Sequence, residues 1–123
     1  AAVKISLGRQ KYLDLFSLES KRDWSHAKDI IDAFLLVGHA SQPDDYIVAS
    51  GSHSSVADLC SHAFEHLGLD YRKYVRTMGD SGQPEVVLLG DSKKLKSLGW
   101  ESTIGVKEIM TELVNHELRR GSE

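Results

Sequence analysis

Apolar residues recur along this chain at helical spacing, most regularly in the segment that follows Ser55. Ser55 and Asp58 have the sequence of a capping box, which commonly begins a helix, and Gly68 stands where a helix commonly ends. The apolar positions between them are spaced at i, i+3, i+4, i+7, i+8 and i+11, namely Val56, Leu59, Cys60, Ala63, Phe64 and Leu67. The pattern predicts a core helix over residues 56–67.

Two further segments have the same period. The first runs from His26 to Val37, ends at Gly38, and carries an apolar stripe of Ala27, Ile30, Ile31, Phe34 and Leu35. The second runs from about Gly105 to Arg119 and carries a stripe of Val106, Ile109, Met110, Leu113 and Val114. A shorter helix is expected after Asp91, ending near Trp100. We expect each stripe to face the core.

Short segments between these helices have the character of strands. Residues 11–18 alternate loosely between apolar and polar positions, and Tyr46–Ser50 is a short apolar run after a turn. Residues 71–76 and 85–89 are further candidates. Together these elements predict an α/β fold, with helices around a small mixed sheet, in a single domain over residues 1–123.

Composition narrows the classes of function. The chain has 123 residues, 41% of them hydrophobic and 27% charged, with a net charge of −3, which indicates one small globular domain. The cluster Lys93, Lys94 and Lys96 is brief and has no aromatic neighbours, so nucleic acid is not implied. No apolar run approaches a membrane span, no secretory signal is seen, and the single Cys60 fits a reducing compartment. We therefore predict a cytoplasmic protein. Because the first residue is Ala1 and not methionine, we expect a piece of a longer protein.

The segment Lys21–Ala27 is the most informative candidate site. It brings an arginine, a carboxylate and an indole to the entrance of a predicted helix. The Arg22 guanidinium can donate two hydrogen bonds to one phosphate, and a helix N-terminus favours negative charge beside it. The alternative interpretation is a helix cap with a surface ion pair.

Sequence motifs for a complete active site are missing. The chain contains no G-x-G-x-x-G, no Walker loop, no Tyr-x-x-x-Lys pair and no G-x-S-x-G. His62, Glu65 and His66 match the H-x-x-E-H zinc pattern, but they lie largely opposite the apolar stripe of their helix, so we interpret them as a solvated face. The other histidines have no metal-like spacing, and Cys60 is expected to be an inert core thiol. We therefore predict no catalytic residue and no metal site in this chain.

Several motifs in one order resemble a known family. They are Lys21–Ala27, the segment from Asp44 to Gly51 with the following Ser55-Val56, Leu89-Gly90-Asp91, and Leu98-Gly99-Trp100. From Lys4 to about Leu118 the chain resembles the C-terminal, sugar-nucleotide-binding part of the GDP-mannose 4,6-dehydratases. These are lyases of the extended short-chain dehydrogenase/reductase superfamily.

The resemblance implies a division of labour between two parts of the enzyme. In that family NADP is bound by an N-terminal Rossmann half, which also carries the catalytic residues, and the sugar nucleotide is bound largely by the C-terminal part. The implied reaction oxidises mannose at C4, removes water across C5–C6 and returns the hydride to C6. It implies three substrate-binding residues here: Lys4, Arg22 near the diphosphate, and Glu85 at the ribose hydroxyls. No cofactor-binding residue is implied in this chain.

Two departures from the family pattern affect anionic groups. Val3 stands where the family has an arginine that contacts NADP, and Gly82 stands where it has a phosphate-binding arginine. Losing one such arginine removes a charged hydrogen bond of about 1.5–3 kcal/mol, or tenfold or more in affinity. A divergent or degenerate epimerase- or reductase-type remnant therefore remains an alternative, as does a non-enzymatic interaction module.

The resemblance also sets expectations for partners. We expect the isolated chain to be inactive and to bind a GDP-sugar weakly. Where the Rossmann half would dock, we expect exposed apolar surface, to be covered by that domain or by a second copy of the chain.

Overall fold

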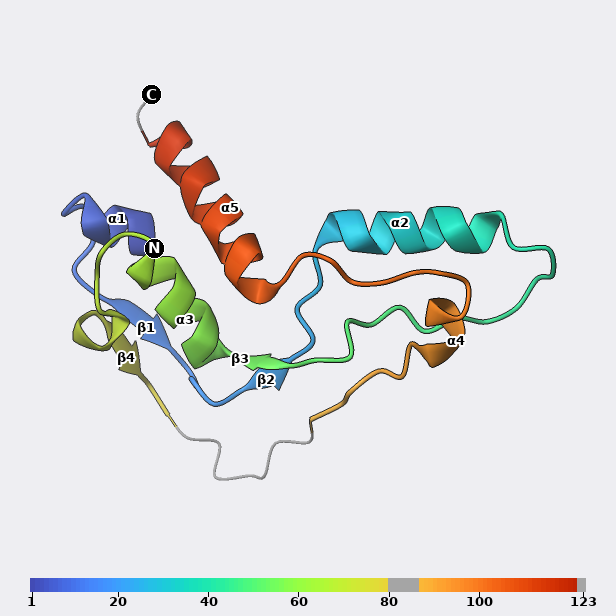
Figure 1. Ribbon diagram of the computed structural model, residues 1–123. Coiled ribbons are helices and arrows are strands. Elements are labelled where there is room, and N and C mark those ends of the chain that lie inside the picture. Colours follow the sequence, from blue (N-terminus) through green and yellow to red (C-terminus); the bar gives the residue numbers. More distant parts are fainter. Residues whose placement is uncertain (80–86, 122–123) are drawn as a thin grey trace. The chain divides into compact units, whose positions relative to one another are not determined.

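The computed structural model describes residues 1–79 and 87–121, and within them the chain divides into two compact units (Figure 1). The described residues of the first unit are 1–20, 55–79 and 107–121. Those of the second are 21–54 and 87–106. The single-domain interpretation stays a prediction.

The first unit combines three helices with a two-stranded parallel sheet. Its helices are α1 (Ala2–Ser6), α3 (Val56–Glu65) and α5 (Val106–Arg120), the last beginning at the boundary of the second unit. Strand β1 (Leu13–Leu15) pairs with β4 (Val75–Thr77), with Asp14 opposite Arg76 (Figure 1). A 3-10 turn, η1 (Tyr71–Lys73), occupies the first half of the strand expected over 71–76. Its cause is local, because the Asp70 carboxylate accepts a hydrogen bond from the Arg72 N–H at 3.1 Å.

Helix α3 begins at the predicted capping box and ends at Glu65, two residues before the predicted end. The Ser55 hydroxyl accepts from the Asp58 N–H at 3.1 Å, and the Asp58 carboxylate accepts from the Ser55 N–H at 2.8 Å. Its apolar stripe packs against α1 and α5, and the ring of Phe64 stacks on that of Tyr74 at 6.0 Å between centroids. The buried core of this unit is Val3, Ile5, Ala63, Phe64 and Val114.

The second unit holds a helix against a short helical turn. It contains β2 (Lys21–Arg22), α2 (Ala27–Gly38) and α4 (Lys93–Lys96), and β2 pairs with β3 (Ser54–Ser55). Ala33, Leu95 and Trp100 form its buried core. The helix expected up to Trp100 is therefore limited to α4, and Trp100 follows it as a core residue.

The prediction that the apolar stripe of α2 faces the core is wrong. Ile31, Phe34 and Leu35 are 52%, 60% and 58% exposed, whereas Ala33 on another face is fully buried. The small Ala33 side chain lets Leu95 and Trp100 approach the helix, with Leu36 and Val37 beside them. α2 is thus apolar on two faces, and the hydrophobic period alone did not identify the buried one.

Two segments of this unit that were predicted to be strands do not form β-strands. Tyr46–Ser50 and residues 87–89 have no assigned strand, and residues 85 and 86 lie outside the described part of the chain. The two segments still lie against each other, because a Cβ placed on Gly90 would stand 2.5 Å from the Cβ of Ala49. Only glycine fits this approach.

The predicted architecture, helices with a small sheet, is confirmed by these elements. Among the described residues, no helix has the length and apolar character needed to cross a membrane.

Candidate functional site

The segment before α2 is held in place by contacts to a loop about thirty residues away. The Asp23 carboxylate accepts from the Ser25 hydroxyl at 2.9 Å and from the backbone N–H of Gly51 at 3.2 Å. The Trp24 indole N–H donates to the Ser54 carbonyl at 3.0 Å. Gly51 has φ of +81°, a conformation that favours glycine. Asp23 and Trp24 therefore fix the loop of residues 50–54 against the entrance of α2.

Arg22 lies exposed in β2, directly before these anchors. Its Nη1 donates to the Lys21 carbonyl at 2.6 Å. The helix itself begins one residue later than predicted, at Ala27. His26 is its N-cap, and its ring nitrogen Nδ1 accepts from the Lys28 N–H at 3.1 Å. The structure thus places a solvent-facing guanidinium on a segment whose backbone is anchored on both sides.

Asp29 is a buried residue of this segment whose role the sequence pattern did not predict. It is 1% exposed, and its carboxylate accepts four hydrogen bonds from the loop of residues 102–104. Their lengths are 3.1 Å from the Ser102 hydroxyl, 2.9 and 2.8 Å from the N–H and hydroxyl of Thr103, and 3.0 Å from the Ile104 N–H. The sequence signal that could have identified Asp29 was a charged residue in the first turn of a helix rich in apolar residues.

The environment of Asp29 favours its ionised form. Burial by itself raises the pKa of the carboxyl, but the hydrogen bonds from Ile104, Thr103 and Ser102 outweigh it, and the pKa lies below its ordinary value. The backbone carbonyl of Asp29 also accepts from the Trp100 indole at 2.9 Å. One residue therefore ties α2 both to the core tryptophan and to the loop of residues 102–104.

These two anchored loops line a polar pocket of about 300 Å³ within the second unit. Its lining residues are Trp24, Ser50, Ser52, Ser54, Ser102, Thr103, Ile104, Gly105 and Val106. Hydroxyl groups both donate and accept hydrogen bonds, and a half-exposed indole offers a flat apolar face. This combination suits a ligand rich in hydroxyl groups, such as a sugar or a ribose. The described residues that line the pocket include no charged side chain, so a diphosphate would need a cation from outside this lining, and Arg22 stands two residues before Trp24.

The other two sequence-predicted binding residues are Lys4 and Glu85. Lys4 is exposed on α1 in the first unit, and its carbonyl accepts from the backbone of Arg9 at 2.8 Å. Glu85 and Gly82 lie outside the described residues. Val3, which stands in place of the NADP-contacting arginine, is 4% exposed and belongs to the core of the first unit. It offers no charge to a dinucleotide.

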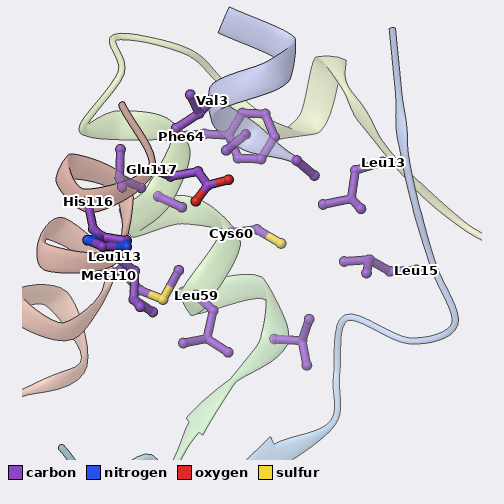
Figure 2. A pocket seen from close by; sticks show the side chains of 15 residues that line it. Val3, Leu13, Leu15, Leu59, Cys60, Phe64, Met110, Leu113, His116 and Glu117 are labelled. Carbon is purple, nitrogen blue, oxygen red and sulfur yellow. The ribbon is translucent and has the colours of Figure 1, made fainter. Parts of the chain in front are cut away.

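The first unit contains a different kind of cavity, an apolar one of about 430 Å³ between α1, β1, α3 and α5. Figure 2 shows Val3, Leu13, Leu59, Phe64 and Met110 around it, with Glu117 as the acidic side chain among the labelled residues. Cys60 also lines this cavity, and burial raises the pKa of its thiol, which fits the predicted inert core cysteine. The described lining is apolar except for His116 and Glu117, so this cavity does not suit a sugar nucleotide.

Of the H-x-x-E-H side chains, His66 and Glu65 are hydrogen-bonded to protein groups, whereas His62 Nδ1 is buried with no hydrogen-bond partner in the described part of the chain. His66 Nε2 lies 2.8 Å from the Asn115 side-chain oxygen, and Glu65 accepts from the Ser61 hydroxyl at 2.5 Å. In the described part of the chain, no group of three histidine, cysteine or acidic side chains is placed to hold a metal ion.

The same fold occurs in solved structures of nucleotide-sugar enzymes. The structure of RMD from Pseudomonas aeruginosa complexed with NADPH matches with a TM-score of 0.85 and 17% identity, over 97% of this chain and 40% of that one. A dTDP-glucose 4,6-dehydratase from Bacillus anthracis, in complex with NAD, matches with a TM-score of 0.77 and 18% identity. This match covers 99% of this chain and 38% of that one. The fold is that of part of an extended short-chain dehydrogenase/reductase.

Sequence comparison identifies the family within this class. The profile of the GDP-mannose 4,6 dehydratase family matches residues 1–113, and the chain belongs to that family. GDP-mannose 4,6 dehydratase 2 of Arabidopsis thaliana is 33% identical over 118 residues, covering 94% of this chain and 32% of the relative. The human GDP-mannose 4,6 dehydratase is 28% identical over 138 residues, covering 96% of this chain and 37% of the human protein. The predicted resemblance is confirmed, and the chain spans about a third of the length of these relatives.

Proposed function

We propose that this chain is the sugar-nucleotide-binding part of a GDP-mannose 4,6-dehydratase and that it is not catalytic by itself. The observation that carries the proposal is the anchored segment of Arg22, Asp23 and Trp24 beside a hydroxyl-lined pocket. In this proposal Arg22 holds the diphosphate by charge-assisted hydrogen bonds, because a guanidinium fork matches phosphate oxygens. The hydroxyls of the pocket orient the sugar or ribose.

Lys4 and Glu85 complete the proposed set of substrate contacts. A lysine supplies a second positive charge for the diphosphate, and a glutamate accepts from the two ribose hydroxyls. Both roles follow from the family resemblance. Their support is the resemblance alone, whereas Arg22 also lies directly before the anchored Asp23 and Trp24.

The hydride carrier of the reaction is assigned to another part of the enzyme. NADP supplies the redox step in the family resemblance, but Val3 is buried in an apolar core, and we assign no described residue to that cofactor. Nor do the described residues include an acid–base pair in the polar pocket. This chain therefore contributes binding and orientation.

A divergent member of the same superfamily is the second candidate function, and it is favoured by Val3. An arginine cannot be exchanged for a buried valine without losing its contact to an anionic cofactor. In this second candidate, the protein would act on a sugar nucleotide by epimerisation or reduction.

The isolated chain is expected to form no 4-keto-6-deoxy sugar from GDP-mannose and NADP. The physical reason is that the described lining of the polar pocket offers hydroxyls but includes no general base. Incubation of pure protein with both compounds, followed by chromatography of the sugar nucleotides, measures this directly. Product formation at a rate proportional to protein concentration would show that the chain contains its own catalytic groups.

A further inference from the structure

The turn that follows helix α1 lines a pocket with two cationic side chains. This pocket of the first unit has a volume of about 480 Å³ and is lined by Ile5, Gly8, Arg9, Gln10, Lys11 and Tyr74. Ile5 and Tyr74 supply apolar surface, whereas Arg9 and Lys11 supply positive charge. The described lining includes no acidic side chain. The pocket therefore differs both from the hydroxyl-lined pocket of the second unit and from the apolar cavity of the first.

The backbone of this turn is fixed by hydrogen bonds. The Lys4 carbonyl accepts from the backbone N–H groups of Arg9 at 2.8 Å and of Gln10 at 3.2 Å. The side-chain amide of Gln10 donates to the Tyr12 carbonyl at 2.6 Å. The cationic side chains therefore start from an ordered backbone, which lowers the entropy cost of holding a ligand between them.

Neither positive charge has a carboxylate partner among the described residues. Arg9 Nη1 donates to a backbone carbonyl just after α5 at 3.4 Å, and a guanidinium has further N–H donors for a ligand. Lys11 Nζ lies 5.3 Å from the centroid of the Tyr12 ring, a contact that holds the ammonium without removing its charge. Asp14 in β1 is engaged by Arg76 through hydrogen bonds of 2.7 and 2.9 Å. The pocket therefore keeps a net positive charge.

We propose that this pocket binds a phosphate monoester of a small aromatic or apolar group. A phosphate monoester carries about 1.5 to 2 negative charges at pH 7, which matches a guanidinium and an ammonium together. The surface of Ile5 and Tyr74 receives the organic group, and the Tyr74 ring is held by stacking on Phe64 at 6.0 Å between centroids. The proposal does not depend on the proposed function, because Arg22 and the hydroxyl-lined pocket belong to the second unit.

The test is a titration of the isotope-labelled chain with phenyl phosphate, followed by NMR spectroscopy. We expect the backbone amide signals of residues 8–11 to shift. The double variant Arg9→Gln, Lys11→Gln should bind phenyl phosphate at least tenfold more weakly than wild type. Phenol lacks the phosphate and inorganic phosphate lacks the ring, so each should also bind at least tenfold more weakly than phenyl phosphate.

The matched control is the double variant Arg72→Gln, Lys73→Gln. It removes the same two kinds of charge from exposed positions of η1 in the same unit, and it should leave the affinity for phenyl phosphate unchanged. Circular dichroism of both double variants confirms that they remain folded. An equal loss in both would show attraction by net charge and would overturn the proposal.

Three other results would also overturn it: no shift at residues 8–11, unchanged affinity in the Arg9→Gln, Lys11→Gln variant, or binding of phenol as tight as that of phenyl phosphate. Arg22→Ala should leave the affinity for phenyl phosphate unchanged. A loss in Arg22→Ala as large as that in the Arg9→Gln, Lys11→Gln variant would place the phosphate in the second unit and contradict the proposal. If GDP binds equally to wild type and Arg22→Ala while residues 8–11 still respond to phenyl phosphate, only the proposed function is contradicted.

Discussion

Replacing Asp29 by alanine is expected to lower the free energy of unfolding by about 2–4 kcal/mol, because its hydrogen-bond donors lose their acceptor. The affected groups are the Ser102 and Thr103 hydroxyls and the N–H groups of Thr103 and Ile104. The hydroxyls can turn to water, but the two N–H groups are fixed by the backbone. Urea unfolding monitored by circular dichroism measures the loss.

Asp32→Ala is the matched control for this prediction. Asp32 lies on the same helix, its side chain is 50% exposed, and it pairs with Lys28 at the surface. Exposed pairs of this kind contribute about 0.3–0.5 kcal/mol, so the control should change stability little. Equal losses for Asp29→Ala and Asp32→Ala would mean that the four hydrogen bonds do not stabilise the unit.

Acid should reduce the stabilisation by Asp29. Its pKa is lowered in the fold, so its contribution is fully present above the ordinary carboxyl pKa of about 4 and is lost as the pH falls through the lower folded value. The difference in unfolding free energy between wild type and Asp29→Ala should therefore be constant near neutral pH and shrink below about pH 4. A difference that grows on acidification would reverse the sign of the assigned shift.

The local parts of this fold could be predicted from sequence, because their signals lie within a few residues of one another. The capping box of Ser55 and Asp58, and the stripe through Phe64, depend on neighbours in one helix, and both are as predicted. The final helix begins at Val106, one residue from its predicted start.

The predictions that failed concern residues whose packing partners lie far away in the sequence. The buried face of α2 is determined by Leu95 and Trp100, about sixty residues away, and the period of a helix with apolar residues on two faces does not reveal which face is buried. The same holds for Asp29, whose donors lie more than seventy residues along the chain. In the site, sequence placed Arg22 at a helix entrance, but the contacts of Asp23 to Gly51 and of Trp24 to Ser54 needed the structure.

Removing the guanidinium of Arg22 should weaken binding of GDP-mannose to the isolated chain at least tenfold. A charged hydrogen bond to phosphate contributes about 1.5–3 kcal/mol, and 1.4 kcal/mol corresponds to a factor of ten in affinity. Titration calorimetry of wild type and Arg22→Ala with GDP and with GDP-mannose measures the change. Both ligands should be affected alike, because the diphosphate is common to them. The affinity of Arg22→Lys should lie between those of wild type and Arg22→Ala, because lysine keeps the positive charge but lacks the planar guanidinium.

The control for this prediction is Arg72→Ala, which removes an equally cationic side chain, 76% exposed, from the first unit. It should leave the affinity for GDP-mannose unchanged, so a loss as large as that of Arg22→Ala would indicate binding by net charge alone. Raising the salt concentration separates the same possibilities, because a general electrostatic attraction is screened more strongly than a direct hydrogen bond. If Arg22→Ala binds as tightly as wild type, Arg22 does not contact the diphosphate, and the role of the Lys21–Ala27 segment reduces to capping α2 and anchoring the loop of residues 50–54.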